Sequence, residues 1–176
     1  MKEPNAAVPL AGATAGELKV RLPQDPDPLN PNEDPDDPDP SMLWPAGQYT
    51  LWATFTFEKD LRVTNELAFS LAPIIVSIDA LDKASLKINF NPMLRQGQKA
   101  SLLIGNKEIL PVSPVLPTYQ LIFDASLVSS GDHPVRLRID GVESQFIDLN
   151  SRPPTFIKRA TFDANDPKSI TVANIK

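Results

Sequence analysis

The chain contains no cysteine, and His133 is its only histidine. Without cysteine there can be no disulfide, no thiolate metal site and no thiol nucleophile. One histidine also falls short of the ligand set that a zinc site needs, and the Gly-x-Ser-x-Gly motif of a serine nucleophile is missing from the sequence. We therefore predict no catalytic residue, no metal site and no enzymatic activity. Because His133 precedes a proline where an alternating segment starts, we interpret it as a turn residue.

Glycine and long apolar runs are also scarce. The seven glycines are dispersed, so no glycine-rich loop could hold a phosphate or a nucleotide cofactor. No apolar run reaches the length of a membrane-spanning helix, and the first residues lack the apolar core of a secretion signal. The formal net charge of −5, without a clustered basic face, argues against nucleic acid as a partner. We expect no cofactor, no membrane span and no nucleic-acid partner.

Proline, by contrast, is abundant, and it gathers in one acidic segment. Residues 23–40 hold seven prolines, seven acidic residues and no lysine or arginine, with Leu29 as the one apolar side chain besides proline. Like charges repel and almost nothing can be buried, so we expect an extended, solvated loop. Calcium binding is the alternative, but repeated proline keeps apart the carboxylates that calcium needs to converge. We therefore expect no metal in this loop.

A β-hairpin is the clearest local signal in the chain. Residues 134–139 alternate aliphatic side chains with arginine, which is typical of a strand with one buried and one solvated face. Asp140-Gly141 comes next, and both residues tolerate the positive φ of a tight type I′ turn. Val142 then opens the return strand. A sandwich built from such hairpins presents surfaces rather than a reactive pocket.

Similar alternating segments recur through the middle of the chain, and none has a helical period. We expect strands at Ile74–Leu81, Ser85–Phe90, Ala100–Ile104, Glu108–Leu110, Tyr119–Phe123 and in the hairpin from Pro134 to Leu149. Short strands at a spacing of roughly eight to twelve residues are typical of a β-sandwich. We predict an all-β protein with an immunoglobulin-like β-sandwich over residues 73–150.

Residues 18–72 predict a partial second sandwich, preceded by a flexible N-terminus at residues 1–17. Leu18–Leu22 and the segment from Gln48 to Leu71 supply only three strands. Either this block packs as an extra sheet on the other sandwich, or it is half of an immunoglobulin-like domain whose remaining strands lie elsewhere, which we favour. The strand Gln48–Phe57 has an apolar face that another polypeptide should cover. The candidate interface residues here are Tyr49, Trp52 and Phe55.

Residues 151–176 predict a basic, β-prone C-terminal tail. They include five basic and two acidic residues and two short alternations, at Thr155–Phe162 and Ile170–Ile175. Such a segment either adds a strand to the sheet of a neighbouring molecule or remains a partly ordered terminus. We include Phe156 and Ile157 among the candidate interface residues.

Four stretches of the sequence resemble one protein family. Leu-Trp-Pro-Ala-Gly-Gln-Tyr-Thr-Leu (43–51) and Thr-Asn-Glu-Leu-Ala-Phe-Ser-Leu-Ala-Pro (64–73) look like the end of one immunoglobulin-like repeat of the IPT type. Residues 93–105 and 135–144 look like the body and the end of the next repeat. The order is similar to the C-terminal region of the cap, or tail-terminator, proteins of contractile injection systems of the Photorhabdus virulence cassette and antifeeding prophage type.

The resemblance implies a structural subunit at the cap end of the sheath and tube of a contractile phage-tail-like particle. It implies sheath, tube or cap proteins as partners, sixfold ring symmetry, no cofactor, and assembly in the bacterial cytoplasm. Family members begin with a globular module that has no equivalent before Leu18, so we expect either a C-terminal piece or a companion subunit. The alternative function is a carbohydrate- or surface-binding module that uses Trp44 and Trp52 as stacking platforms.

Overall fold

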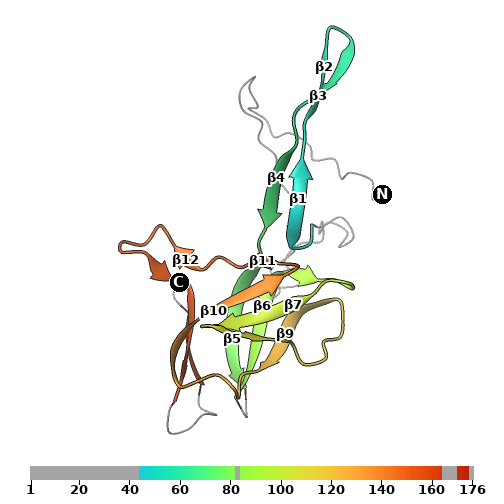
Figure 1. The fold of residues 1–176 in the computed structure, drawn as a ribbon. Helices are drawn as coiled ribbons and strands as arrows, with labels where there is room; N and C mark the ends of the chain where they lie inside the picture. The colour runs from blue at the N-terminus through green and yellow to red at the C-terminus, as the bar shows by residue number, and fades with distance from the viewer. Residues whose placement is uncertain (1–43, 82–83, 164–169, 175–176) are drawn as a thin grey trace, which may run out of the picture. The chain divides into compact units, whose positions relative to one another are not determined.

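The computed structural model describes residues 44–81, 84–163 and 170–174 (Figure 1). The chain divides into two units, Met1–Trp44 and Pro45–Lys176, and every strand below belongs to the second unit. The expected strand Leu18–Leu22 and the acidic loop at residues 23–40 lie outside the described residues.

The described residues form β-strands and no helix, which confirms the all-β prediction. Every ladder among them is antiparallel. The strands are β1 (Gly47–Leu51), β2 (Thr54–Phe57), β3 (Asp60–Val63), β4 (Leu67–Leu71), β5 (Ile74–Leu81), β6 (Ser85–Leu94), β7 (Ala100–Ile104), β8 (Lys107–Ile109), β9 (Thr118–Asp124), β10 (Gly131–Ile139), β11 (Val142–Glu143), β12 (Ile147–Asp148), β13 (Thr155–Phe156), β14 (Lys158–Phe162) and β15 (Ile170–Asn174).

Two sheets make the sandwich, as the strand spacing predicted. One sheet has the order β5-β6-β9, and the other has the order β15-β14-β10-β7-β8 with β11 beside β10 (Figure 1). Alternate side chains of both sheets point inward and exclude water, so each large one contributes about 1.5–3 kcal/mol. One buried cluster includes Ile75, Ile78, Leu86, Ile88, Phe90, Leu94, Leu102, Ile104, Leu121, Phe123, Val135, Leu137, Ile139, Ala160 and Phe162. The immunoglobulin-like order of the strands stays a prediction.

The hairpin at Asp140-Gly141 forms as predicted, but its return strand is shorter. Asp140 has a φ of 47° and Gly141 a φ of 83°, as a type I′ turn requires. The return strand β11 ends at Glu143 instead of continuing to Leu149. Beyond it, the backbone N–H of Ser144 still donates to the carbonyl of Leu137 at 2.7 Å. The chain then leaves β10 because β14 pairs with the Gly131–Pro134 end of that strand.

The C-terminal strands belong to this chain's own sandwich, which differs from the expected tail at residues 151–176. β14 pairs with β10, and β15 pairs with β14. Ala160 and Phe162 are buried in the core, and Lys158 Nζ lies 3.4 Å from the Val76 carbonyl oxygen of β5. The predicted domain boundary at residue 150 is therefore wrong, because the sandwich continues into β14 and β15. The alternation at Thr155–Phe162 indicates a strand with one apolar face, but it does not indicate which sheet buries that face.

His133 lies inside β10, so the interpretation as a turn residue is wrong. It pairs with Ala160 of β14, and its ring is tilted against Phe162 with 6.0 Å between the ring centres. Its Nε2 atom bonds the carbonyl oxygen of Ser129 at 2.9 Å. The next residue, Pro134, is tolerated because it forms the last pair of the β10–β14 ladder, opposite Arg159, so its missing N–H falls at the end of that ladder.

Charged side chains cover the outer face of the larger sheet. Glu143 accepts hydrogen bonds from Arg138 Nη2 at 2.6 Å and from Arg136 Nη1 at 2.6 Å. Arg138 Nη1 also donates to Glu108 at 3.0 Å. The Arg138 hydrogen bond, with the nearby charge of Arg136, holds the pKa of Glu143 below its usual value. These arginines are neutralised by their neighbours and do not form a free basic patch.

Replacing Gly141 by valine should destabilise the sandwich by about 1–3 kcal/mol, because a β-branched residue is strained at positive φ. A Cβ at this position would meet no atom within 4 Å, so the cost is conformational and not a clash. Urea unfolding measures the effect. Gly141→Asn is the matched control, because asparagine tolerates the left-handed conformation. Equal losses in the two variants would contradict the backbone explanation.

The ion pairs of Glu143 should make the protein less stable in acid. The folded pKa lies below the ordinary value of 4.5, so the unfolded chain takes up the proton first as the pH falls. The contribution is therefore complete above about pH 4.5 and is lost as the pH falls through the folded pKa. Glu143→Gln should show a flatter acid limb than the wild type in urea midpoints. The same substitution at exposed Glu66 is the control, and an unchanged acid limb in Glu143→Gln would argue against the mechanism.

Candidate functional site

Residues 47–71 form a long two-stranded ribbon, which we call the ribbon. It consists of the β1–β4 ladder and the β2–β3 ladder. The predicted continuous strand Gln48–Phe57 is therefore wrong in one respect, because it is broken at Trp52 and Ala53. Leu51 pairs with Leu67, and Thr54 pairs with Val63. Between these two pairs, two residues of the outgoing chain oppose three residues of the return chain. The extra residue of this bulge lies in the return segment, so the alternation of Gln48–Phe57 alone could not indicate it.

Thr64 connects the two ladders across the bulge. Its backbone N–H donates to the carbonyl oxygen of Ala53 at 2.9 Å, and its hydroxyl Oγ1 accepts from the Ala53 N–H at 2.9 Å. These two bonds satisfy backbone groups that the interrupted ladder would otherwise leave unpaired. The ribbon therefore continues through the irregularity.

An aromatic pair occupies one face of the β1–β4 ladder. Tyr49 and Phe69 lie opposite each other, and their rings stack with 5.4 Å between centres and 23° between planes. The Tyr49 hydroxyl donates to the carbonyl oxygen of Pro45. Burial raises the pKa of this phenol; Arg95 opposes the shift and Asp140 adds to it. Tyr49 is thus half-buried and remains a hydrogen-bond donor.

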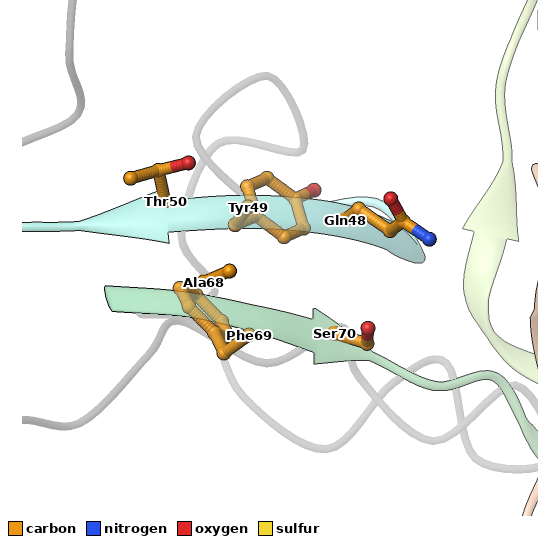
Figure 2. A pocket seen from close by; sticks show the side chains of 6 residues that line it. All are labelled: Gln48, Tyr49, Thr50, Ala68, Phe69 and Ser70. Atoms are coloured by element: carbon orange, nitrogen blue, oxygen red, sulfur yellow. The ribbon is translucent and has the colours of Figure 1, made fainter. Parts of the chain in front are cut away.

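A hollow of about 370 Å³ lies along the same ladder. Figure 2 shows the six side chains that line it, three from β1 and three from β4. They are Gln48, Tyr49, Thr50, Ala68, Phe69 and Ser70. The lining includes hydroxyl and amide groups but no carboxylate, imidazole or amine. The hollow therefore offers hydrogen bonds and apolar contact, and Tyr49 is the one titratable side chain among the six that line it.

The β2–β3 hairpin exposes apolar side chains on both faces. Glu58 and Lys59, with φ values of 49° and 74°, form its turn. Leu61 and Val63, which are 72% and 60% exposed, share one face, while Phe55, 48% exposed, lies on the other. The strand β3 was not predicted, although the alternation Leu61-Arg62-Val63 was an available sequence signal for it.

The ribbon is therefore the best candidate for a protein interface among the described residues. Besides the β2–β3 residues, Trp52 is 40% and Leu67 is 65% exposed. A two-stranded ribbon is marginally stable by itself, and contiguous exposed apolar surface is typical of an interaction site. The structure brings Tyr49, Trp52 and Phe55 together in this one element, but Tyr49 already packs on Phe69 and offers less surface than the other two.

Phe156 and Ile157 belong to a different element, which we call the strap (residues 144–157). Phe156 packs against Phe146 with 4.9 Å between ring centres. The guanidinium of Arg136 lies 4.8 Å from the centre of the Phe146 ring, and that of Arg159 lies 5.0 Å from the centre of the Phe156 ring. The strap thus contacts arginines of β10 and β14 through cation–π contacts. Phe156 has partners within this chain.

The carboxylates of Asp79 and Asp124 have separate hydrogen-bond partners. Asp79 pairs with Lys87 at 3.0 Å and accepts from Asn89 at 3.1 Å, whereas Asp124 accepts from the backbone N–H of Ser126 at 2.9 Å. Among the described residues no three histidine, cysteine or acidic side chains gather as metal ligands. The same part of the chain includes no helix long and apolar enough to cross a membrane.

Comparison with known proteins yields one family. The matching model is described as a domain of unknown function (DUF8756), and it matches residues 66–171. No curated protein and no solved structure matches the chain. The matched region starts beside the bulge, includes the strands from β4 to β14, and ends inside β15. It therefore includes the C-terminal strands in the domain and leaves β1, β2 and β3 outside it. The chain belongs to the DUF8756 family.

Proposed function

We propose that this protein is a non-enzymatic structural subunit of a contractile phage-tail-like particle, at the cap or terminator end of the sheath and tube. It binds a neighbouring protein subunit through the ribbon. The resemblance to the cap-protein family over residues 43–150 supports the setting, because that range includes both the ribbon and most of the sandwich. Sheath, tube or cap proteins are the proposed partners, in a sixfold ring assembled in the bacterial cytoplasm.

The exposed apolar surface of the ribbon carries this proposal. Aromatic side chains are frequent anchors of protein interfaces, and the ribbon exposes Trp52, Phe55, Leu61 and Val63. Because Phe55 lies on the opposite face of the hairpin from Leu61 and Val63, the partner must cover both faces. Complete burial of a large apolar side chain contributes about 1.5–3 kcal/mol, and burial of the exposed part of each of these four contributes a fraction of that. Together they offset part of the roughly 4–15 kcal/mol that association costs in lost freedom of motion. A partner that covers the ribbon also supplies the second layer that a two-stranded element lacks.

The proposed role as a structural subunit, and not an enzyme, rests on the character of the two surfaces. The hollow on the ribbon is lined by amide, hydroxyl and apolar groups. The arginines of the larger sheet are engaged with carboxylates and with the phenylalanine rings of the strap. Both surfaces are therefore suited to stable contact with another protein and not to catalytic turnover.

Acidic substitutions in the ribbon should separate the protein from its particle. We expect the full chain, co-expressed with the sheath and tube subunits of a contractile particle, to sediment with the particles. The double variant Phe55→Asp, Leu61→Asp should reduce the bound fraction roughly 100-fold or more, because two large apolar contacts are lost. Leu127→Asp is the matched control, since Leu127 is 86% exposed outside the ribbon. Undiminished sedimentation of the double variant would overturn the ribbon interface.

The isolated chain provides a second readout. We expect it to self-associate through the uncovered ribbon, and the double variant to shift towards the monomer in analytical ultracentrifugation. The carbohydrate-binding alternative predicts a different result, namely that soluble polysaccharide alone quenches the fluorescence of Trp44 and Trp52. Such quenching without any particle binding would favour that alternative.

A further inference from the structure

A group of hydrogen bonds centred on Gln98 joins three segments that are distant in the sequence. The Gln98 Nε2 amide donates to the carbonyl oxygen of Ala46 at 2.8 Å and to Asp140 Oδ2 at 3.1 Å. Ala46 immediately precedes β1, Gln98 lies in the turn between β6 and β7, and Asp140 lies in the turn between β10 and β11. One side chain thus connects the root of the ribbon with two turns of the sandwich.

The orientation of the Gln98 amide is fixed by its surroundings. Its Oε1 accepts from the backbone N–H of Arg95 at 3.0 Å, so the nitrogen must face Ala46 and Asp140. Asp140 is held in turn, because its Oδ1 accepts from the Lys99 N–H at 2.9 Å and its own N–H donates to the Lys99 carbonyl oxygen at 2.9 Å. Groups of the sandwich therefore hold the Gln98 Nε2 donor in its orientation independently of Ala46.

The root of the ribbon contacts the sandwich in a second way. Ala46 is 2% exposed and belongs to the buried core cluster. Burial raises the pKa of Tyr49, three residues further on; the charge of Arg95 opposes this shift and that of Asp140 adds to it, and both residues bond Gln98. At its other end the ribbon continues directly from β4 into β5 through Ala72 and buried Pro73. The ribbon is thus attached to the sandwich covalently through residues 72–73, by the burial of Ala46 and by the hydrogen bond from Gln98 to Ala46.

We propose that Gln98 is a latch that fixes the orientation of the ribbon on the sandwich, so that its removal lets the ribbon pivot about residues 72–73 while the sandwich stays folded. The consequence for assembly rests on the proposed function, because a ribbon of fixed orientation loses less freedom when it docks on a partner. Gln98 is in this sense a positioning residue for the interface.

The absence of cysteine allows a direct test with two spin labels on the full chain. Labels at Lys59→Cys in the ribbon turn and Leu127→Cys in the sandwich, diluted with unlabelled chain, report their separation within one molecule by pulsed electron–electron double resonance, since both side chains are exposed. We expect Gln98→Ala to broaden the distance distribution at least twofold and to leave the thermal midpoint of the sandwich nearly unchanged. Gln98→Glu should broaden it as well, because its carboxylate would face the Asp140 carboxylate and the Ala46 carbonyl.

Gln96→Ala, in the same turn and exposed, is the matched control and should leave the distribution unchanged. An unchanged distribution in Gln98→Ala would overturn the latch. A lost sandwich transition in that variant would overturn it too, because Gln98 would then support the whole core.

The sedimentation assay separates this inference from the proposed function. If the ribbon double variant still bound particles, the interface would fail while the distance measurement would still decide the latch. A broadened distribution with unchanged particle binding would overturn the link between latch and assembly.

Discussion

The fold depends above all on the burial of alternating apolar side chains between its two sheets. β6 and β10 supply the centre of this contact, where Ile88, Phe90 and Leu137 are fully buried. Because this core requires a second layer over each sheet, every strand that joins it is fixed in register by its inward side chains. The C-terminal strand β14 obeys the same rule, since Ala160 and Phe162 enter the core beside β10. A core assembled from strands so distant in sequence makes the domain depend on its C-terminal part.

The two outer faces use polar interactions in different ways. On the smaller sheet, Asn89 donates to Ser77 and Asp79, and Asp79 also forms an ion pair with Lys87. On the larger sheet, Arg136 and Arg159 receive the phenylalanine rings of the strap as well as acidic partners. The Nε atoms of both arginines are buried without a hydrogen-bond partner, which is consistent with their lying beneath aromatic rings. The strap therefore combines apolar cover with charge neutralisation.

The ribbon contrasts with the sandwich because it has no second layer of its own among the described residues. Its two ladders satisfy their backbone groups across the bulge at Thr64, yet large apolar side chains remain exposed on it. The family match starts at residue 66, so the sandwich is the shared domain and β1 to β3 precede it. In the assembly that we propose, a partner supplies the cover that the ribbon lacks. Gln98 then determines how firmly the ribbon is presented.

The sequence by itself determined the features that depend on neighbouring residues. Ile74–Leu81 and Ala100–Ile104 were predicted with the bounds they have, because period-two alternation is a local signal. Asp140-Gly141 likewise specified its turn through the φ angles that these residues tolerate. Tertiary structure decided the rest: which strand buries Phe162, where the ribbon bulges opposite Trp52, and that Phe156 meets Phe146. Alternation reveals that one face of a strand is apolar, but pairing, register shifts and the identity of the covering layer arise only from contacts between distant segments.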